Sequence, residues 1–356
     1  MEQVIPFVQF FIIVQCVLFL VFLSFNARAK VLSNKVLGAL ITILALHMLV
    51  NLFNQHLLIG VLPNIGVSFG FCYGPIFYFY TKAVAYREFK FTSKHLVHAI
   101  PAIVAALLSA MTKLDVLVFA LAIFTSLSLY SFCIFKILKK YRYILSQTRS
   151  EYEQIALNWM SYLLILQFTL LGLNIISVTF YMTGFIFLGQ LTEILLFLGL
   201  WLLVSLIIFQ GLQHPQLYSG VTVEDTKIVE SEGEYQGLPQ EILSDLIIQI
   251  DTYMAEKEPF LTSGLTVKSL GKQLSLNPRY ISQAINAKAG KNFSEYVNVY
   301  KIKHACQLLT SKDQQSPSVI DVMLQSGFNT KSNFNRAFKS ETGCTPFEYK
   351  QRSQKK

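Results

Sequence analysis

Two stretches near the C-terminus decide the fold of this chain: TVKSLGKQLSLNPRYISQAINA at residues 266–287 and PSVIDVMLQSGFNTKSNFNRAFKSETG at residues 317–343. Each predicts a helix, a tight turn and a second helix that opens with polar residues. Between them, residues 292–309 predict one helix that is about 25 Å long at 1.5 Å per residue. Together they predict two helix-turn-helix units held apart by a central helix, at a separation that suits successive turns of a DNA duplex.

Local residue chemistry marks where these helices begin. Asn277-Pro278, Ser316-Pro317 and Thr345-Pro346 each place a capping side chain before a proline, which is favourable in the first turn of a helix. Apolar residues at helical spacing supply the expected core of each unit. They are Leu270, Leu274, Leu276, Ile281, Ala284 and Ile285 in the first unit, and Ile320, Leu324, Phe328, Phe334 and Phe338 in the second.

The N-terminal part is far more apolar than a soluble domain. Hydrophobic residues make up 53% and charged residues 14% of the 356 residues. Seven stretches of residues 1–210 are long and apolar enough to span a membrane, where backbone groups must bond within a helix. They lie at residues 4–25, 36–54, 64–84, 97–112, 115–136, 157–182 and 184–210. The expected fold class is all-α: a polytopic seven-helix transmembrane bundle followed by a cytoplasmic domain with two helix-turn-helix units.

The loops of this bundle differ in charge. Those after the first, third and fifth expected spans and the adjoining helix ends carry 12 basic residues, whereas the intervening loops carry only Lys113. The positive-inside rule places the N-terminus outside and the C-terminal domain in the cytoplasm, so we expect a multi-pass protein of the cell inner membrane, in contact with membrane lipid. The basic residues are Arg28, Lys30, Lys35, Lys82, Arg87, Lys90, Lys94, Lys136, Lys139, Lys140, Arg142 and Arg149.

Charge and periodicity also divide the C-terminal half. Residues 211–237 hold one basic residue against five acidic ones and predict an acidic flexible linker that spans on the order of 30 Å. Residues 238–257 predict an amphipathic connecting helix, which packs on the following domain or on its copy in a homodimer. Residues 258–356 form the last domain. From residue 262 it holds 15 Lys/Arg against 5 Asp/Glu, which indicates nucleic acid or anionic lipid as a partner.

A few polar side chains fall inside the expected spans, all in the outer half of the membrane by this topology. Charged groups there are costly and commonly functional. The side chains either line a pocket for an unknown ligand or hydrogen-bond between helices and stabilise the bundle. For Glu193 the first role is favoured, because a carboxylate costs more to bury than an amide. The candidate ligand residues are His47, Asn51, Asn174, Gln190 and Glu193.

No pattern for catalysis, a cofactor or a metal is found in the sequence. There is no nucleophile–base pair, phosphate loop or inverted repeat, and no histidine lies at metal-ligand spacing from a cysteine. We therefore expect a protein that is not an enzyme and that holds no cofactor. The cysteines are expected to be reduced packing residues: Cys16, Cys72, Cys133, Cys306 and Cys344.

Residues 250–352 closely resemble the DNA-binding domain of AraC/XylS-type bacterial transcription regulators. The resemblance rests on LTVKSLGKQLSLNPRYISQAIN, NFSEYVNVYKIKHACQLL and VIDVMLQSGFNTKSNFNRAFKSETGCTPFEYKQR, and above all on the GF…F…FK…G…P…Y pattern. It implies two helix-turn-helix units whose recognition helices enter successive major grooves. The membrane half looks like the seven-helix N-terminal regions of some membrane-bound AraC-type proteins, through features such as YGPIFYFY at residues 73–80.

The resemblance also implies which side chains face DNA. Arginine can bind guanine, asparagine and glutamine can bind adenine, and lysine suits a phosphate. Two residues depart from the family pattern: Met323 replaces a small alanine, which loosens packing, and Lys301 replaces an arginine, which puts a bidentate contact in doubt. The DNA-facing residues would be Arg279, Ser282, Gln283 and Asn286 in the first unit, and Lys331, Ser332, Asn335, Arg336 and Lys339 in the second.

The leading functional hypothesis is a membrane-bound, one-component transcription regulator that binds double-stranded DNA sequence-specifically. Its transmembrane bundle would act as the sensor, with a ligand that favours one of two states. The alternative is a transporter-like or enzymatic membrane protein whose helix-turn-helix domain serves regulation or protein or lipid interaction. DNA binding that withstands lipid vesicles as a competitor would separate the two.

Overall fold

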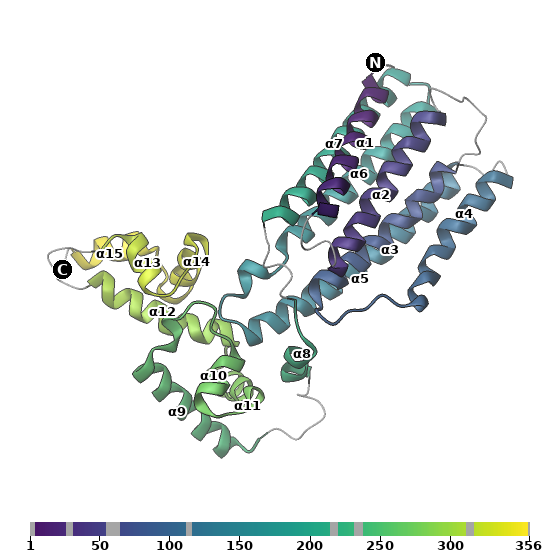
Figure 1. The fold of residues 1–356 in the computed structure, drawn as a ribbon. Coiled ribbons are helices and arrows are strands. Elements are labelled where there is room, and N and C mark those ends of the chain that lie inside the picture. Colours follow the sequence, from purple (N-terminus) through teal and green to yellow (C-terminus); the bar gives the residue numbers. More distant parts are fainter. Residues whose placement is uncertain are drawn as a thin grey trace. The chain divides into compact units, whose positions relative to one another are not determined.

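All the secondary-structure elements in the part of the chain that the computed structural model describes are helices (Figure 1). The described residues are 4–25, 31–54, 65–111, 116–213, 220–230, 238–310 and 317–354. The chain divides into two compact units, which we call the bundle unit and the C-terminal unit. The bundle unit is Met1–Lys139 with Leu157–Gly220, and the C-terminal unit is Lys140–Ala156 with Val221–Lys356. The expected all-α class is confirmed.

The bundle unit consists of long helices that run side by side (Figure 1). α2 packs between α1 and α3, and α7 packs against both α1 and α6. The helices are α1 (Val4–Phe25), α2 (Leu32–Leu52), α3 (Gly66–Ala85), the 3₁₀ helix η2 (Ser93–Ala99) with α4 (Ile100–Met111), α5 (Val116–Thr148), α6 (Asn158–Met182) and α7 (Ile186–Gln213).

Among the described residues, six helical stretches are long and apolar enough to cross a membrane. α3 has the length but not the hydropathy, because tyrosines, glycines and Lys82 dilute its apolar residues. The expected number of spans was seven, and α3 accounts for the difference. The span expected at residues 97–112 begins earlier, at Ser93. Arg28, Lys30 and Lys113, on which the expected topology partly rests, lie outside the described residues.

α5 continues well beyond the expected end of its span at residue 136, as far as Thr148. The prediction ended at the first of several basic residues. The helix nevertheless keeps an apolar face through this basic stretch, because Leu138, Tyr141 and Leu145 recur at helical spacing and are buried. From Lys140 onward, α5 belongs to the C-terminal unit.

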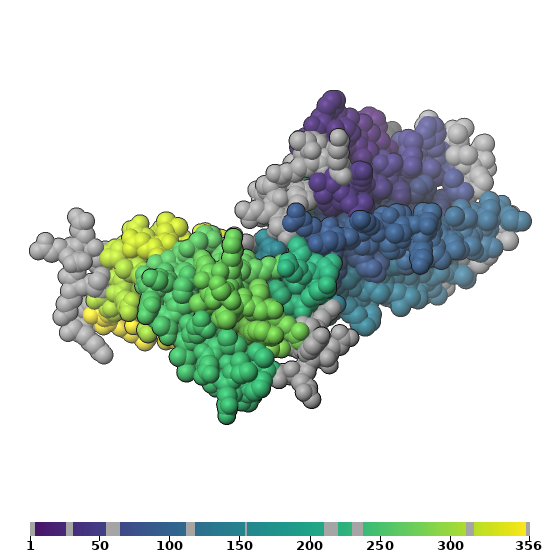
Figure 2. Space-filling model, turned by 60° about the horizontal axis from the view of Figure 1, so that its bottom comes forward, coloured from purple at the N-terminus to yellow at the C-terminus, as the bar shows by residue number. Residues whose placement is uncertain are grey.

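The C-terminal unit is built mostly of helices of 7 to 18 residues. Its residues from 221 onward are coloured green to yellow in the space-filling view (Figure 2). α10 and α11 form the first helix-turn-helix unit, α13 and α14 form the second, and α12 is the central helix between them. The elements are η3 (Tyr152–Ile155), α8 (Val223–Glu230), α9 (Gln240–Lys257), η5 (Pro259–Leu261), α10 (Val267–Leu274), α11 (Pro278–Ala284), the π-helix η6 (Ile285–Ala289), α12 (Phe293–Thr310), α13 (Val319–Gln325), α14 (Lys331–Thr342) and α15 (Pro346–Gln354).

Helix caps define both units. The Asn277 side chain accepts a hydrogen bond from the Arg279 amide, 3.0 Å away, as its position before a proline predicts. In the second unit the cap differs from the prediction: Ser318 caps α13, and the expected cap Ser316 lies outside the described residues. Gly327 ends α13 with a φ of +74°, a backbone angle that favours glycine.

The core of the second unit differs from the prediction in part. Phe328, Phe334 and Phe338 are buried as expected, but Ile320 and Leu324 are each 57% exposed. The opposite face of the helix turns inward and packs against α12. That face carries Val322 and Met323, which pack with residues of α12: Ile302, Ala305 and Leu309. Met323 therefore occupies the core rather than loosening it.

Part of the expected linker is a helix. α8 lies within residues 211–237 and is capped where Thr222 and Asp225 exchange hydrogen bonds. Lys268 pairs with Asp225 at 2.9 Å and with Glu224 at 2.7 Å. Burial alone would raise the pKa of Asp225, but the hydrogen bonds from Thr222 and Lys268 hold it below its ordinary value. A coil was expected because eight residues are too few to show periodicity. Residues 214–219 and 231–237 lie outside the described residues.

The connecting helix α9 packs within its own unit. Two partners were expected as alternatives, the following domain or a second copy of the chain. α9 lies against α11 and η6 and buries Leu243, Ile250 and Met254. These three residues therefore pack on the following domain, as the first alternative expects.

Candidate functional site

α14 separates an aromatic inner face from a polar outer face. Phe334 and Phe338 are fully buried, with ring centroids 5.6 Å apart, and they fix the rotation of the helix. Thr330 caps its first turn by accepting a hydrogen bond from the Asn333 amide, at 3.4 Å. The outer face carries the residues predicted to contact DNA, at positions that repeat along one side of a helix. They are Lys331, Ser332, Asn335, Arg336 and Lys339, of which Asn335 is half-buried and the others are exposed.

The helix predicted to be the first recognition helix, α11, is shorter and more deeply packed than α14. α11 contacts α8, α9 and α10 and continues directly into η6. Arg279, Gln283 and Asn286 are half-buried and lie on one stripe of the helix. Ser282 is only 4% exposed, so it faces the interior in this structure. Three of the four predicted side chains on this helix are thus partly exposed to solvent.

Two acidic residues that the sequence analysis did not single out lie among these basic ones. Glu153 forms an ion pair with Arg336. Glu151 accepts a hydrogen bond from Asn329 at 2.8 Å, in the turn between α13 and α14. Both belong to the segment that follows α5. The sequence did place both glutamates in the loop after the fifth expected span, but only the basic residues of that loop were used, to predict the topology.

Lys301 is a structural residue in this fold. It is 1% exposed, and its ammonium group donates to the Gly327 carbonyl at 2.6 Å and to Glu151 at 3.1 Å. It also lies 5.2 Å from the ring centroid of Phe328. Burial lowers the pKa of Lys301, and the charge of Glu151 opposes that shift. The sequence put a bidentate contact at this position in doubt. In the structure the side chain of Lys301 is buried and bonds within the protein.

The exposed face of α14 offers the chemistry of base and phosphate recognition. Arg336 and Asn335 can pair with the edges of guanine and adenine, and lysines beside them can neutralise phosphates. No group of three or more His, Cys, Asp or Glu residues that could hold a metal ion is found in the described part of the chain.

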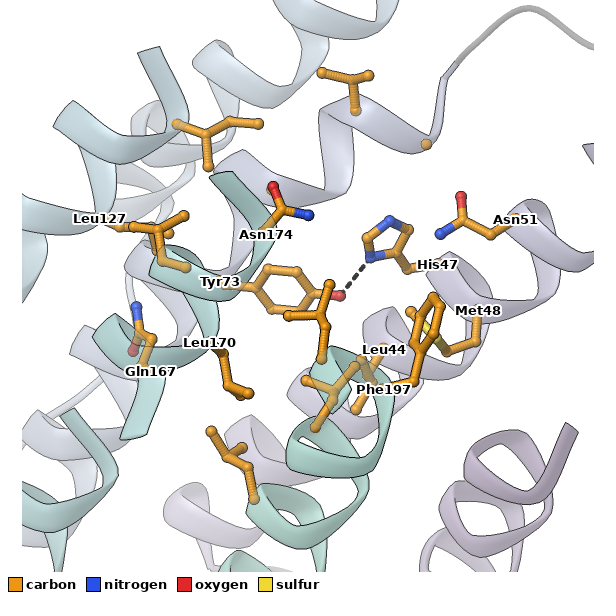
Figure 3. Close-up of a pocket in the computed structure, with 18 of the residues that line it drawn as sticks. Leu44, His47, Met48, Asn51, Tyr73, Leu127, Gln167, Leu170, Asn174 and Phe197 are labelled. Atoms are coloured by element: carbon orange, nitrogen blue, oxygen red, sulfur yellow. Dashed lines mark hydrogen bonds between the residues drawn. The ribbon is translucent and has the colours of Figure 1, made fainter. Parts of the chain in front are cut away.

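The bundle unit contains a second candidate site, a pocket of about 490 Å³ between α2, α3, α5, α6 and α7. Its lining is mostly aliphatic and aromatic. At its centre the ring of His47 hydrogen-bonds the Tyr73 hydroxyl at 2.7 Å, and the carboxamides of Asn51 and Asn174 are drawn on either side of this pair (Figure 3). Within the described residues neither carboxamide hydrogen-bonds another group, so both are available to a bound molecule.

The pocket includes most of the predicted ligand residues. His47, Asn51, Asn174 and Glu193 line it, whereas Gln190 is not among its lining residues. Glu193 accepts a hydrogen bond from the Tyr181 hydroxyl at 2.6 Å. Tyr181 was not among the candidate ligand residues predicted from the sequence, and it stands at the end of α6.

Comparisons with known proteins agree with the architecture of the C-terminal unit. Residues 270–352 match the family described as "Helix-turn-helix domain". An uncharacterized HTH-type transcriptional regulator of Bacillus subtilis (strain 168), YtdP, is 33% identical over 109 residues, which are 31% of this chain and 13% of that protein. A similarly named protein of Staphylococcus aureus (strain MSSA476) is 29% identical over 112 residues, which are 31% of this chain and 14% of the relative.

A solved structure is also similar. It is a protein of unknown function from Listeria innocua, 30% identical, with a TM-score of 0.25, and the match covers 30% of this chain and 94% of that one. The family match and the curated relatives show that the C-terminal unit contains a helix-turn-helix domain. The alignments to the curated relatives span about one seventh of those proteins, and the resemblance of the membrane half stays a prediction.

Proposed function

We propose that this protein is a membrane-anchored transcription regulator that binds double-stranded DNA through α11 and α14. The observation that supports it most is the exposed face of α14, where Lys331, Asn335, Arg336 and Lys339 stand over a buried aromatic core in a helix-turn-helix domain. The names of the similar proteins, HTH-type transcriptional regulators, agree with this role.

The bundle unit supplies the anchor and, in this proposal, the sensor. Its apolar helices are compatible with membrane insertion. The pocket suits a largely apolar molecule with a few hydrogen-bonding groups, because the amides of Asn51 and Asn174, the His47–Tyr73 pair and the Glu193 carboxylate interrupt an apolar lining. Such a molecule would bias the bundle toward one of two states.

Binding of DNA by the full-length protein in lipid nanodiscs tests the proposal. A fragment that begins at residue 238 is a poor substitute, because it lacks Glu151 and leaves the buried Lys301 without its carboxylate. We expect discrete protected sequences in a footprint of genomic fragments, with binding that persists when anionic vesicles compete. If anionic vesicles abolished the binding of DNA, the alternative of a lipid-binding domain would be favoured.

The C-terminus should lie in the cytoplasm. The distribution of basic residues between alternate loops motivates this prediction. A reporter that is glycosylated or cleaved only outside the cell should remain unmodified when it is fused after Lys356. Modification of this fusion, beside a control fusion known to be external, would rule out access of the helix-turn-helix domain to DNA.

Glu193→Gln should keep the protein in the membrane but fix the output of its target genes in one state. Glutamine still accepts the Tyr181 hydroxyl, so the helix contact survives while the charge in the pocket is lost. Tyr181→Phe is the matched variant, since it removes the hydrogen bond and keeps the carboxylate. Membrane abundance and promoter activity across growth conditions measure the effect. Reduced abundance, or unchanged regulation, would show that Glu193 serves only to stabilise the bundle.

A further inference from the structure

The segment between two membrane helices belongs to the DNA-binding part of the fold. Residues 140–156 comprise the last turns of α5 and the connection toward α6, yet they form one compact unit with residues 221–356. The end of this segment, residues 149–155, is here called the acidic strap. It contains Glu151 and Glu153 together with the short helix η3.

Backbone contacts fix the start of the acidic strap on the first helix-turn-helix unit. The Ser150 amide donates to the Leu265 carbonyl at 3.0 Å, and Arg149 pairs with Thr266 in an antiparallel bridge. The Ser150 carbonyl accepts a hydrogen bond from the Ser294 hydroxyl at 2.8 Å, and both serines are buried. Hydrogen bonds of this kind between buried groups are costly to break, so the strap is a packed part of the unit.

Glu151 joins the strap to the second helix-turn-helix unit. One carboxylate oxygen lies 3.1 Å from the Lys301 ammonium group, and the other accepts from Asn329 at 2.8 Å. Because Lys301 is fully buried, removal of this carboxylate would leave a charge in the interior without a counter-ion. Glu151 is thus an anchor on the central helix and on the turn before α14.

Glu153 lies two residues further along and pairs with Arg336 on the outer face of α14. Arg336 is the residue of that face best suited to bind a guanine edge bidentately. A guanidinium group held by a carboxylate cannot present the same fork of donors to a base. The strap and DNA therefore require the same side chain.

We propose that the acidic strap is a built-in competitor of DNA, in which Glu151 anchors the segment and Glu153 occupies Arg336 until DNA displaces it. The inference rests on the proposed function, since competition requires that α14 bind DNA. The surface that receives the strap is formed by Lys301, Asn329 and Arg336, and its partner is an acidic segment of the same chain.

The strap is also continuous with a membrane helix. α5 runs unbroken from Val116 to Thr148, and its residues as far as Lys139 belong to the bundle unit.

The test is the affinity of the full-length protein in nanodiscs for a DNA duplex that the wild-type protein selects from a random library. Glu153→Gln should lower the Kd by roughly two- to fivefold, the range of a partly exposed ion pair. Glu256→Gln is the matched control, because it removes the same charge from an exposed site on α9. In an Arg336→Ala background the effect of Glu153→Gln should vanish.

Hydrogen exchange gives a second, independent readout. Amides of the acidic strap should exchange faster when the wild-type protein is saturated with the duplex. An unchanged Kd for Glu153→Gln, an equal gain in Glu256→Gln, or a gain that persists with Arg336→Ala would overturn the competition while leaving DNA binding intact. If neither the wild type nor any variant retains a duplex, the proposed function itself fails.

Discussion

Replacing Phe338 by alanine should lower the free energy of unfolding of the C-terminal unit by about 3–5 kcal/mol, which is the usual cost of removing a buried phenylalanine. The ring is fully buried in the cluster that joins α12, α13 and α14. Its centroid lies 5.6 Å from that of Phe334 and 5.4 Å from that of Tyr349. Without it α14 loses the packing that fixes its rotation, so DNA binding should be lost as well.

Hydrogen exchange of the full-length protein measures this loss at the amides of α12 and α14. Phe347→Ala is the control, because Phe347 is 61% exposed on α15 and its removal leaves no cavity. We expect that control to change stability by no more than about 0.5 kcal/mol. Equal protection of α14 in the wild type and in Phe338→Ala would contradict the assignment of this aromatic cluster as the core.

Replacing Arg336 by alanine should weaken specific DNA binding by about 1–3 kcal/mol and relax the preference at one base position. Because DNA must first displace Glu153, the loss should be larger when it is measured in the Glu153→Gln protein. Lys339→Ala should instead weaken binding to all sequences and reduce the slope of log K against log salt by about one.

Lys303→Ala is the matched control for both variants, since it removes an exposed cation from α12 rather than from α14. Competition assays with single-base variants of the selected duplex, at several salt concentrations, separate base recognition from phosphate contact. If Arg336→Ala changes neither affinity nor base preference, the assignment of the outer face of α14 to DNA is wrong.

Local sequence signals account for most of the fold. Proline and asparagine positioned α11, glycine ended α13, and the spacing of phenylalanines identified α14, because caps and helical periodicity act within a few residues of each other. The bundle helices could be identified because each is a long, continuous apolar stretch of the sequence. In α13 two neighbouring apolar faces compete. Ile320 and Leu324 were predicted to be buried, but packing against α12 buries Val322 and Met323 instead.

The acidic strap could not be found in this way. Glu151 and Lys301 are 150 positions apart in the chain, and no local pattern links them. Only tertiary packing brings the loop between α5 and α6 beside α14. The partner of Glu193 was missed for a related reason, since Tyr181 contacts it across a tight turn between α6 and α7 rather than along one helix face.

The central claim is tested most directly by sequencing the DNA that is cross-linked to the full-length protein in isolated membranes. Cells that carry the tagged wild-type protein should yield discrete genomic sites that share a sequence motif, and the Arg336→Ala protein at equal membrane abundance should lose them. Uniform genomic coverage that is the same for both proteins would contradict the account of this chain as a membrane-anchored, sequence-specific regulator.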